Sequence, residues 1–285
     1  MLKIINLAII VLLINLNITA PSLGASSSTT QDIKFGVFPY KSPKTIFKLF
    51  NPIVQKLEKQ LNCKVTLVTA PDFDTFIKRG KQGKYDLAMP CVMCYFMIQP
   101  SGYSVIAMGT PTFSGGVLVR SDSNIDTISK LKNKKIASTM KRSYAGHLFL
   151  VKRLSDLNID PYKEVEFHFL GNLDSIILGV ANKQYDAGVV RLDILQNPLF
   201  DTIRGKLKTI AVSRKIPQFP VIVKDTLSFE IKNKIRDTFI SIKSTDPEDA
   251  EILAGLHLKS FVPALDADYN DTMTALKELG FMDNL

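Results

Sequence analysis

Apolar positions along residues 33–89 switch repeatedly between the period of a strand and that of a helix. Ile33–Val37 alternates as a half-buried strand does. Ser42 and Pro43 supply an N-cap and a helix-compatible first position, and apolar residues then recur at helical spacing as far as Leu61. The predicted elements are a strand at 33–37, a helix at 43–61, a strand at 65–69, a helix opening at 73–77 and a strand at 85–89. This rhythm predicts an α/β sandwich with a largely parallel sheet.

A second series of alternating elements follows. The predicted strands are 117–120, 135–138, 165–170 and 187–190, and the predicted helices between them are 126–131, 146–157 and 173–182. Two more strands, 208–213 and 221–223, precede three helices around 229–242, 247–256 and 269–279, the last of which stops at Gly280. The chain is therefore predicted to contain two similar α/β units.

Two extended segments join these units. Thr112–Arg120 leads out of the first unit and Ile210–Val223 leads back into it, so the middle unit is inserted in the first. We predict a tether at 26–32, a first lobe at 33–118 plus 211–285, and an inserted second lobe at 119–210. Two lobes joined by two short hinges form a cleft that can close on a ligand.

The composition excludes a disordered chain and a polytopic membrane protein. With 285 residues, the chain is long enough for two domains that each bury a core. Its 46% apolar and 22% charged residues offer ample surface to bury, and only one stretch, at the very start, is apolar enough to consider as a membrane span. The formal charge of +9 is compatible with three functional classes, namely a nucleic-acid binder, a membrane-surface protein and a collector of small anions.

Residues 1–25 have the pattern of a secretory signal peptide. Lys3 is followed by the apolar run Leu7–Ile14 and by small and polar residues ending at Ala25. Asparagines interrupt the apolar stretch, and a membrane span needs about 20 apolar residues. We predict cleavage and export; one Lys and no acid leave with the peptide, so the mature charge is +8. Because an exported protein does not meet the chromosome, and no nucleic-acid-binding motif is visible, nucleic acid is not an expected partner.

Several stretches, in order over residues 33 to about 223, carry a family resemblance. They are Gly36–Pro39, Pro52–Glu58, Gly83–Ala88 with Tyr95, Val119–Ile125, Lys135–Ala137, Ser143 with Gly146, Gly171–Asp174 and Asn182–Gly188. The chain resembles the periplasmic solute-binding proteins of phosphonate, phosphite and phosphate ABC importers, a family that also includes arsenite-binding sensors. The resemblance implies a type II periplasmic-binding-protein fold and delivery of a captured oxyanion to an ABC permease in the membrane. Together with the predicted signal peptide, it leads us to expect a periplasmic location, and we expect no cofactor. We expect a monomer.

The resemblance also implies where the anion binds. In the family, a Ser-Thr-Ser-Gly turn at the start of a helix in the second lobe holds the anion, and a Tyr of the first lobe faces it. The corresponding turn here is Ser143, Tyr144, Ala145 and Gly146, of which the first and last match, and Tyr95 matches the first-lobe Tyr. A helix N-terminus carries free N–H groups and a partial positive charge, so it can hold a phosphate-like group without a metal.

A pair of cysteines, Cys91 and Cys94, follows a predicted strand directly. On a helical turn they share a face, which would point into the cleft. Four interpretations stay open. The pair forms a disulfide in an oxidising compartment, or binds a thiophilic species such as arsenite or Cu(I) for a membrane sensor kinase, or is the redox pair of a thiol–disulfide oxidoreductase, or is simply two small buried residues.

Polar residues at element ends supply the remaining candidates. Arg191 ends a predicted strand, where open α/β folds place ligands, and it either clamps an oxyanion or pairs with Asp193. Asn172 is a candidate contact near the start of a helix, and Asp174, at that start, is either an N-cap or a ligand contact.

Two residues of the first lobe, Tyr40 and Ser42, lie in the loop after the first strand, where Ser42 either faces the cleft or caps the helix. The three histidines are scattered, and the sequence contains no metal-binding His pattern, nucleophile elbow, Walker A loop or dinucleotide fingerprint. We therefore predict a binding protein and not an enzyme. Its expected ligand contacts are Tyr40, Ser42, Cys91, Cys94, Tyr95, Ser143, Tyr144, Ala145, Gly146, Asn172, Asp174 and Arg191.

Overall fold

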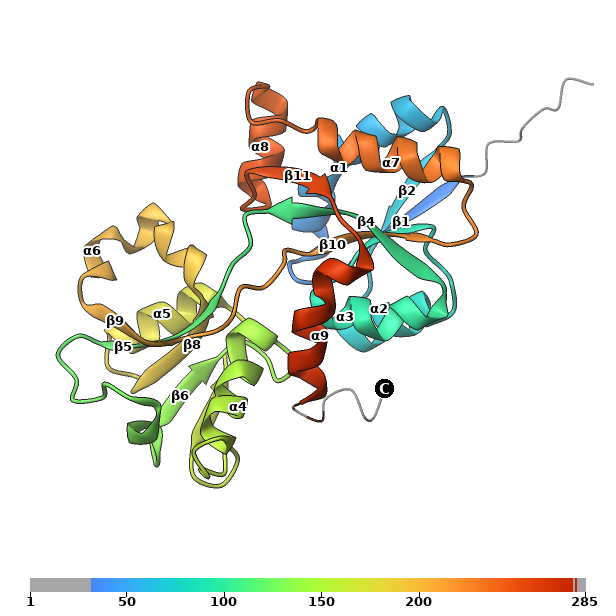
Figure 1. Ribbon diagram of the computed structural model, residues 1–285. Coiled ribbons are helices and arrows are strands. Elements are labelled where there is room, and N and C mark those ends of the chain that lie inside the picture. Colours follow the sequence, from blue (N-terminus) through green and yellow to red (C-terminus); the bar gives the residue numbers. More distant parts are fainter. Residues whose placement is uncertain (1–31, 279, 281–285) are drawn as a thin grey trace, which may run out of the picture. The chain divides into compact units, whose positions relative to one another are not determined.

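The computed structural model describes residues 32–278 and residue 280 (Figure 1). These residues belong to one unit of the chain, residues 31–285. The predicted signal peptide, residues 1–25, lies outside the described residues. Two β-sheets with helices packed on their faces organise the described part into two α/β lobes.

The first lobe is built on a six-stranded sheet in the order β11-β4-β10-β3-β1-β2. The pairs β1–β2 and β1–β3 are parallel, and the pairs that involve β4, β10 and β11 are antiparallel. The strands are β1 (Ile33–Val37), β2 (Val65–Val68), β3 (Leu87–Met89), β4 (Tyr103–Thr110), β10 (Pro220–Lys224) and β11 (Ser260–Pro263).

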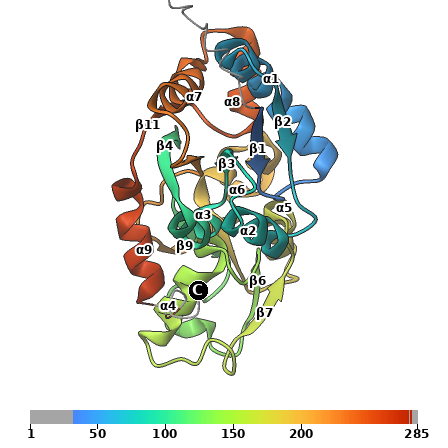
Figure 2. The same cartoon turned by 90° about the vertical axis from the view of Figure 1, so that its right-hand side faces the viewer.

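Helices cover this sheet on both faces (Figures 1 and 2). On one face lie α1 (Pro43–Leu61), α7 (Phe229–Ser241) and α8 (Pro247–Gly255), and on the other lie α2 (Phe73–Lys81) and α3 (Val92–Ile98). Phe35 of β1 stands edge-on to Phe50 of α1 and Phe239 of α7, with ring centroids 5.8 and 6.1 Å apart. Edge-to-face aromatic contacts of this kind add to the area that the rings bury.

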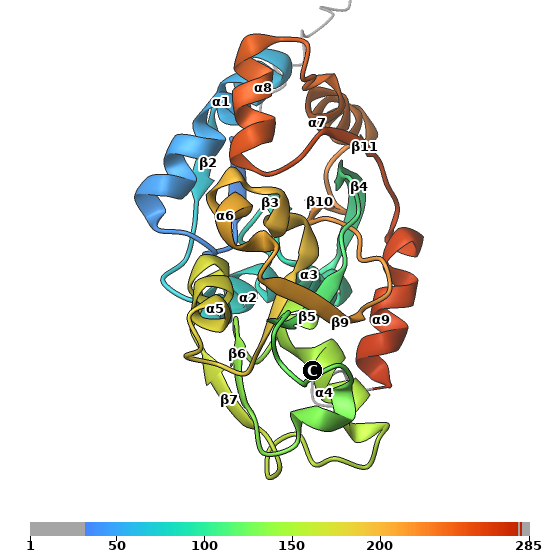
Figure 3. The same ribbon diagram turned by 90° about the vertical axis from the view of Figure 1, so that its left-hand side faces the viewer.

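The second lobe is built on a five-stranded sheet in the order β7-β6-β8-β5-β9 (Figure 3). β6 pairs in parallel with β7 and β8, and β5 is antiparallel to β8 and β9. The elements are β5 (Gly115–Arg120), β6 (Lys135–Ser138), α4 (Phe149–Ser155), β7 (Glu166–Phe169), α5 (Leu173–Ala181), β8 (Ala187–Arg191), α6 (Asp201–Arg204) and β9 (Leu207–Val212). Val117 and Val119 of β5 face the core under α4, and Leu118 between them faces the core under α5, as the strand period of two requires.

Two crossovers, residues 111–114 and 213–219, connect the sheets. They pair with each other, because Phe113 and Ile216 exchange backbone hydrogen bonds of 3.0 and 2.8 Å. The buried Gln218 adds a third link, since its Nε2 donates to the Pro111 carbonyl at 2.8 Å. The two hinges therefore behave as one short antiparallel ribbon.

A C-terminal helix, α9 (Asn270–Lys277), extends from the first lobe along the second (Figures 1 and 2). Its Leu276 joins a core cluster that includes Leu148 at the start of α4. This contact ties the second lobe to the first outside the two crossovers.

The sequence predicted the fold class and most elements correctly, with three differences. Both sheets are mixed rather than largely parallel, because β4, β5, β9, β10 and β11 run antiparallel to their neighbours. The strands β4 and β11 and the helices α3 and α6 were not predicted, and the helix predicted at 126–131 is a 3-10 turn at Ile128–Leu131. The predicted lobe boundaries at 118/119 and 210/211 fall inside β5 and β9, and both strands belong wholly to the second sheet.

Candidate functional site

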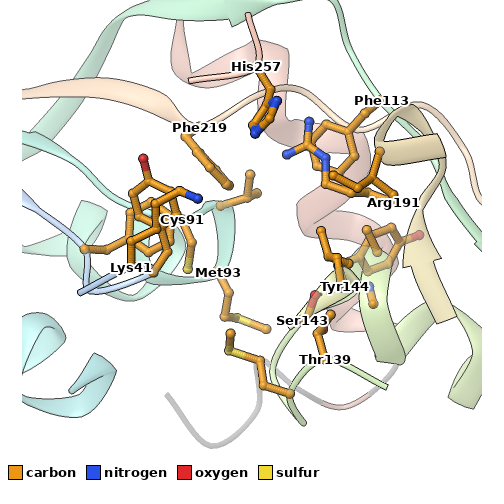
Figure 4. Close-up of a pocket in the computed structure, with 18 of the residues that line it drawn as sticks. Lys41, Cys91, Met93, Phe113, Thr139, Ser143, Tyr144, Arg191, Phe219 and His257 are labelled. Atoms are coloured by element: carbon orange, nitrogen blue, oxygen red, sulfur yellow. Dashed lines mark hydrogen bonds between the residues drawn. The ribbon is translucent and has the colours of Figure 1, made fainter. Parts of the chain in front are cut away.

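A cavity of about 1330 Å³ lies between the two lobes (Figure 4). The first lobe contributes the loop after β1 and the start of α3, and the second contributes the turn after β6, the start of α5 and the end of β8. All the predicted contact residues except Tyr95 line it: Tyr40, Ser42, Cys91, Cys94, Ser143, Tyr144, Ala145, Gly146, Asn172, Asp174 and Arg191. Both walls of the cavity therefore contain predicted contact residues.

The predicted anion turn opens the helical segment that ends in α4. Ser143 is the N-cap, and its Oγ accepts the Gly146 N–H at 3.1 Å. Tyr144–Leu148 forms a π-helical turn, in which the Leu148 N–H donates to the Ser143 carbonyl. The N–H groups of Tyr144 and Ala145 precede this first intrahelical bond, so they are free donors at a positive helix end. A π turn at such a place is typical of a functional site.

Buried polar groups support the turn from behind. The Ser138 hydroxyl donates to the Gly146 carbonyl at 2.5 Å, and its Oγ lies 3.2 Å from Nδ1 of His147. The imidazole of His147 is fully buried and stands edge-on to Phe167 and Phe169, with centroids 4.5 and 5.0 Å apart. Burial, with a smaller contribution from Lys141, lowers the pKa of His147 to about 4. The ring is therefore neutral at physiological pH.

Thr139, the residue after β6, lines the cavity beside this turn, and the sequence analysis did not select it. Its side chain is buried and its Oγ1 has no hydrogen-bond partner among the described residues. A single Thr after a strand is common in protein sequences and does not indicate a site. Its position beside the turn Ser143–Gly146 is visible only in the fold.

Arg191 lies on the cavity wall but is already paired. Its Nε and Nη2 donate to the two carboxylate oxygens of Asp193 at 2.7 and 2.5 Å. The guanidinium also stacks on Phe113, 4.0 Å from the ring centroid, and Nη2 lies 3.4 Å from Oε1 of Gln218. Of the two sequence interpretations, the pairing with Asp193 is the one present.

Both cysteines of the pair line the cavity, and Cys91 lies on the first-lobe wall, across the cavity from Ser143 and Thr139 (Figure 4). Cys91 is the N-cap of α3, and its Sγ accepts the Cys94 N–H at 3.1 Å. The two Sγ atoms are 2.7 Å apart, and both residues are free cysteines in this structure. Burial raises the pKa of the Cys94 thiol.

Aromatic rings form the rest of the first-lobe wall. Phe38 stacks on Tyr40 with centroids 4.7 Å apart and stands edge-on to Phe219 at 4.8 Å. Burial raises the pKa of Tyr40 to about 12, so its hydroxyl stays protonated and able to donate. The ammonium of Lys41 lies 5.7 Å from the centroid of the Tyr40 ring, a distance at which a cation is attracted to an aromatic face.

One ion pair joins the two walls. Arg142, in the turn before Ser143, pairs with Asp74 of α2 through Nη1 and Oδ1. Both side chains are exposed, so the pair contributes little to stability in water. Among the described residues, no group of three or more His, Cys, Asp or Glu side chains is placed to hold a metal ion.

Comparison with known proteins gives the family. A family model described as "ABC transporter, phosphonate, periplasmic substrate-binding protein" matches residues 35–269. This chain belongs to that family of periplasmic substrate-binding proteins. Among curated relatives, the phosphate-import protein PhnD of Mycolicibacterium smegmatis is 24% identical over 279 residues, which are 88% of this chain and 86% of the relative. The phosphonates-binding periplasmic protein of Escherichia coli is 26% identical over 240 residues, 79% of this chain and 70% of the relative.

Solved structures confirm the fold of this phosphonate-binding-protein family. PhnD1 from Prochlorococcus marinus, in complex with methylphosphonate, superimposes with a TM-score of 0.75 at 17% identity, covering 89% of this chain and 100% of that one. The type II periplasmic-binding-protein fold is therefore present. Family members are binding components of transporters and not enzymes, as predicted, and the family implies export to the periplasm. No helix of the described residues is long and apolar enough to cross a membrane.

Among the residues predicted from the family pattern, Tyr95 does not line the cavity. It follows Cys94 on α3, so its side chain turns about 100° away from the cavity-lining face of the helix. Its hydroxyl donates to Oδ1 of Asp266 at 2.6 Å, and its ring packs against Tyr269 in the core. Burial and this carboxylate raise the pKa of Tyr95.

Three other predicted residues of this family site have local roles at helix ends. Ser42 caps α1, since its Oγ accepts the Thr45 N–H at 3.3 Å. Asn172, not Asp174, caps α5, and its Oδ1 accepts the Asp174 N–H at 2.7 Å. The Asp174 carboxylate lies in the first turn of α5, where a negative charge is favourable. All three residues line the cavity as well.

Proposed function

We propose that this periplasmic binding protein captures a small tetrahedral oxyanion of the phosphonate, phosphite or phosphate type in the interlobe cavity. The observation that carries the proposal is the turn Ser143–Gly146, which faces the cavity with free N–H groups at a positive helix end. The Ser143 hydroxyl accepts from Gly146 and keeps its own proton to donate. Such donors hold an oxyanion without a metal.

The first lobe supplies the second half of the proposed site. The Tyr40 hydroxyl is available as a donor, and the sulfur and aromatic surface of Cys91, Met93 and Phe219 would contact the organic substituent. The ion pair between Arg142 and Asp74 joins the lobes beside the ligand turn. Hinge closure over a ligand, held by contacts from both lobes, is the usual action of this architecture.

The proposed partner is an ABC permease, in keeping with the family's role. We propose that a cleaved signal peptide, residues 1–25, exports the chain and that the mature protein acts as a monomer. Its basic charge of +8 would draw anions toward the cleft.

Calorimetry tests the proposed ligand class. The mature chain, refolded to remove carried-over ligand, is titrated with methylphosphonate, phosphite and phosphate, and we expect 1:1 binding of at least one. Ser143→Ala should weaken that ligand roughly tenfold or more, because a hydrogen bond to a charged group is lost. Ser228→Ala is the matched control, since Ser228 caps α7 outside the lining of the cavity. Absence of heat with all three anions would refute the proposal.

The cysteine pair supports a second candidate, a binder of arsenite or Cu(I) that signals to a membrane sensor kinase. Two Sγ atoms 2.7 Å apart on a cavity wall can approach one soft ion together. The thiol oxidoreductase interpretation has less support, because members of this family are binding components of transporters and not enzymes.

Replacing both cysteines by Ser separates the two candidates. In the double variant Cys91→Ser, Cys94→Ser we expect the affinity for the oxyanion to stay within about threefold, because Ser is close to Cys in size and the charged oxygens of the anion rest on the opposite wall. Cys63→Ser, outside the cavity lining, is the control. If the protein is a sensor for a thiophilic species, the double variant instead loses arsenite or Cu(I) binding, and the wild type binds that species more tightly than any phosphonate.

A further inference from the structure

Thr139 presents a buried hydroxyl that the fold does not use. The residue is 8% exposed, and its Oγ1 has no hydrogen-bond partner among the described residues. Buried hydroxyls nearly always have a partner, because an unmade bond carries the full cost of desolvation. Thr139 nevertheless belongs to the lining of the interlobe cavity, beside the turn Ser143–Gly146.

The backbone around Thr139 is fixed. Its N–H lies 3.4 Å from the Gly146 carbonyl, and its own carbonyl accepts the Gly171 N–H at 2.9 Å. A β-branched side chain on a fixed backbone has few rotamers. The Gly146 carbonyl already accepts the Ser138 hydroxyl, so that carbonyl does not require the Thr139 proton.

The hydroxyl of Thr139 converges with that of Ser143 on one small space. A Cβ built on Gly146 would lie 2.1 Å from Oγ1 of Thr139 and 2.9 Å from Oγ of Ser143. Both hydroxyls therefore lie against the same face of Gly146, and the absence of a side chain on Gly146 leaves room there for the Thr139 hydroxyl. Figure 4 shows Thr139 and Ser143 next to each other at the edge of the cavity.

We propose that Thr139 is a ligand-binding residue, whose Oγ1–H donates to an oxygen of the anion held by the turn Ser143–Gly146. This proposal rests on the proposed function and deepens it. The anion would then meet two hydroxyl donors from different elements, one following β6 and one capping the π-helical turn, together with the free N–H groups of that turn. Neither hydroxyl carries a charge, so the cradle binds through directed hydrogen bonds and not through an ion pair.

Two substitutions of Thr139 test this role by calorimetric titration with methylphosphonate, phosphite and phosphate. Thr139→Val keeps the branched shape and removes the hydroxyl, and we expect it to weaken the best-bound anion roughly 10- to 100-fold, the range for one hydrogen bond to a charged group. Thr139→Ser keeps the hydroxyl and should stay within about threefold of the wild type. Thr238→Val is the matched control, because Thr238 is a buried Thr of α7 whose hydroxyl donates to the Lys234 carbonyl.

The outcomes separate this inference from the proposed function. If the wild type binds an anion and Thr139→Val binds it equally well, or if Thr139→Val and Thr139→Ser lose affinity equally, the role of Thr139 is refuted while the proposed function stands. If the wild type binds none of the three anions, both are refuted. Thermal melting of each variant checks folding, and a variant that melts like the wild type but has lost affinity supports the inference.

Discussion

Replacing Gly146 by Ala should abolish high-affinity oxyanion binding, with a loss of about 100-fold or more. The added Cβ would lie 2.1 Å from Oγ1 of Thr139 and 2.9 Å from Oγ of Ser143. It would push aside both hydroxyls, which are the proposed donors to the anion. Two hydrogen bonds to a charged group are together worth about 3–6 kcal/mol, so calorimetry with the best-bound anion should show weak binding or none.

Gly205→Ala is the matched control for this substitution. Gly205 lies in the same lobe, a Cβ there would meet nothing within 4 Å, and its φ of −67° suits any residue. We expect unchanged affinity and a gain in stability of up to about 1 kcal/mol, since Ala has fewer unfolded conformations to lose. Equal affinity of Gly146→Ala and wild type would contradict the proposed position of the anion.

The second large effect concerns acid stability and the buried His147. Burial lowers the pKa of its imidazole from 6.5 to about 4 in the folded chain. Below pH 6.5 the unfolded chain therefore binds a proton that the folded chain does not, and the free energy of unfolding falls as the pH falls. The loss reaches about 3 kcal/mol at pH 4 and is complete only below the pKa of the folded chain. Denaturant unfolding between pH 7 and pH 4 measures it.

His147→Asn should flatten this pH dependence, because Asn does not titrate and its amide can still reach Ser138. The partly exposed His168, which lies 2.8 Å from Oε1 of Glu166, provides the control His168→Asn, which should keep the slope. Burial also lowers the pKa of His257, but that residue titrates in both variants and cancels in the comparison. A wild-type curve that is flat from pH 6.5 to pH 4 would show that His147 is not buried as described.

The elements that the sequence predicted well are those with a strong local signal. The helix α1 has a capping Ser42, a Pro at its first position and an apolar stripe that continues to Leu61, and its observed bounds match. The strand β4 also alternates buried and half-buried positions, but it begins directly after the turn that ends at Gly102, and its buried face ends in the small residues Ala107 and Gly109. The alternation of apolar and polar residues is the same in parallel and antiparallel strands. The mixed sheets could therefore not be predicted from the sequence pattern.

The candidate site was predictable to the level of segments but not of single side chains. Both walls of the cavity came from the order of elements and from the family pattern. The direction of Tyr95 depends on one step of 100° along α3, which places Cys94 on the cavity and Tyr95 in the core. The role proposed for Thr139 depends on its distance to Gly146, seven residues later, across a turn whose path the sequence does not specify.

The paired crossovers couple the bending of one hinge to that of the other. Because Phe113 and Ile216 are hydrogen-bonded to each other, neither hinge can bend without the other. Arg191, on the cavity wall, stacks on Phe113 of one hinge and contacts Gln218 of the other. Bending of the hinges therefore moves this part of the cavity wall. Ligand affinity thus includes the free-energy difference between open and closed populations. Substitutions that soften or stiffen the ribbon will change the apparent dissociation constant without touching the ligand.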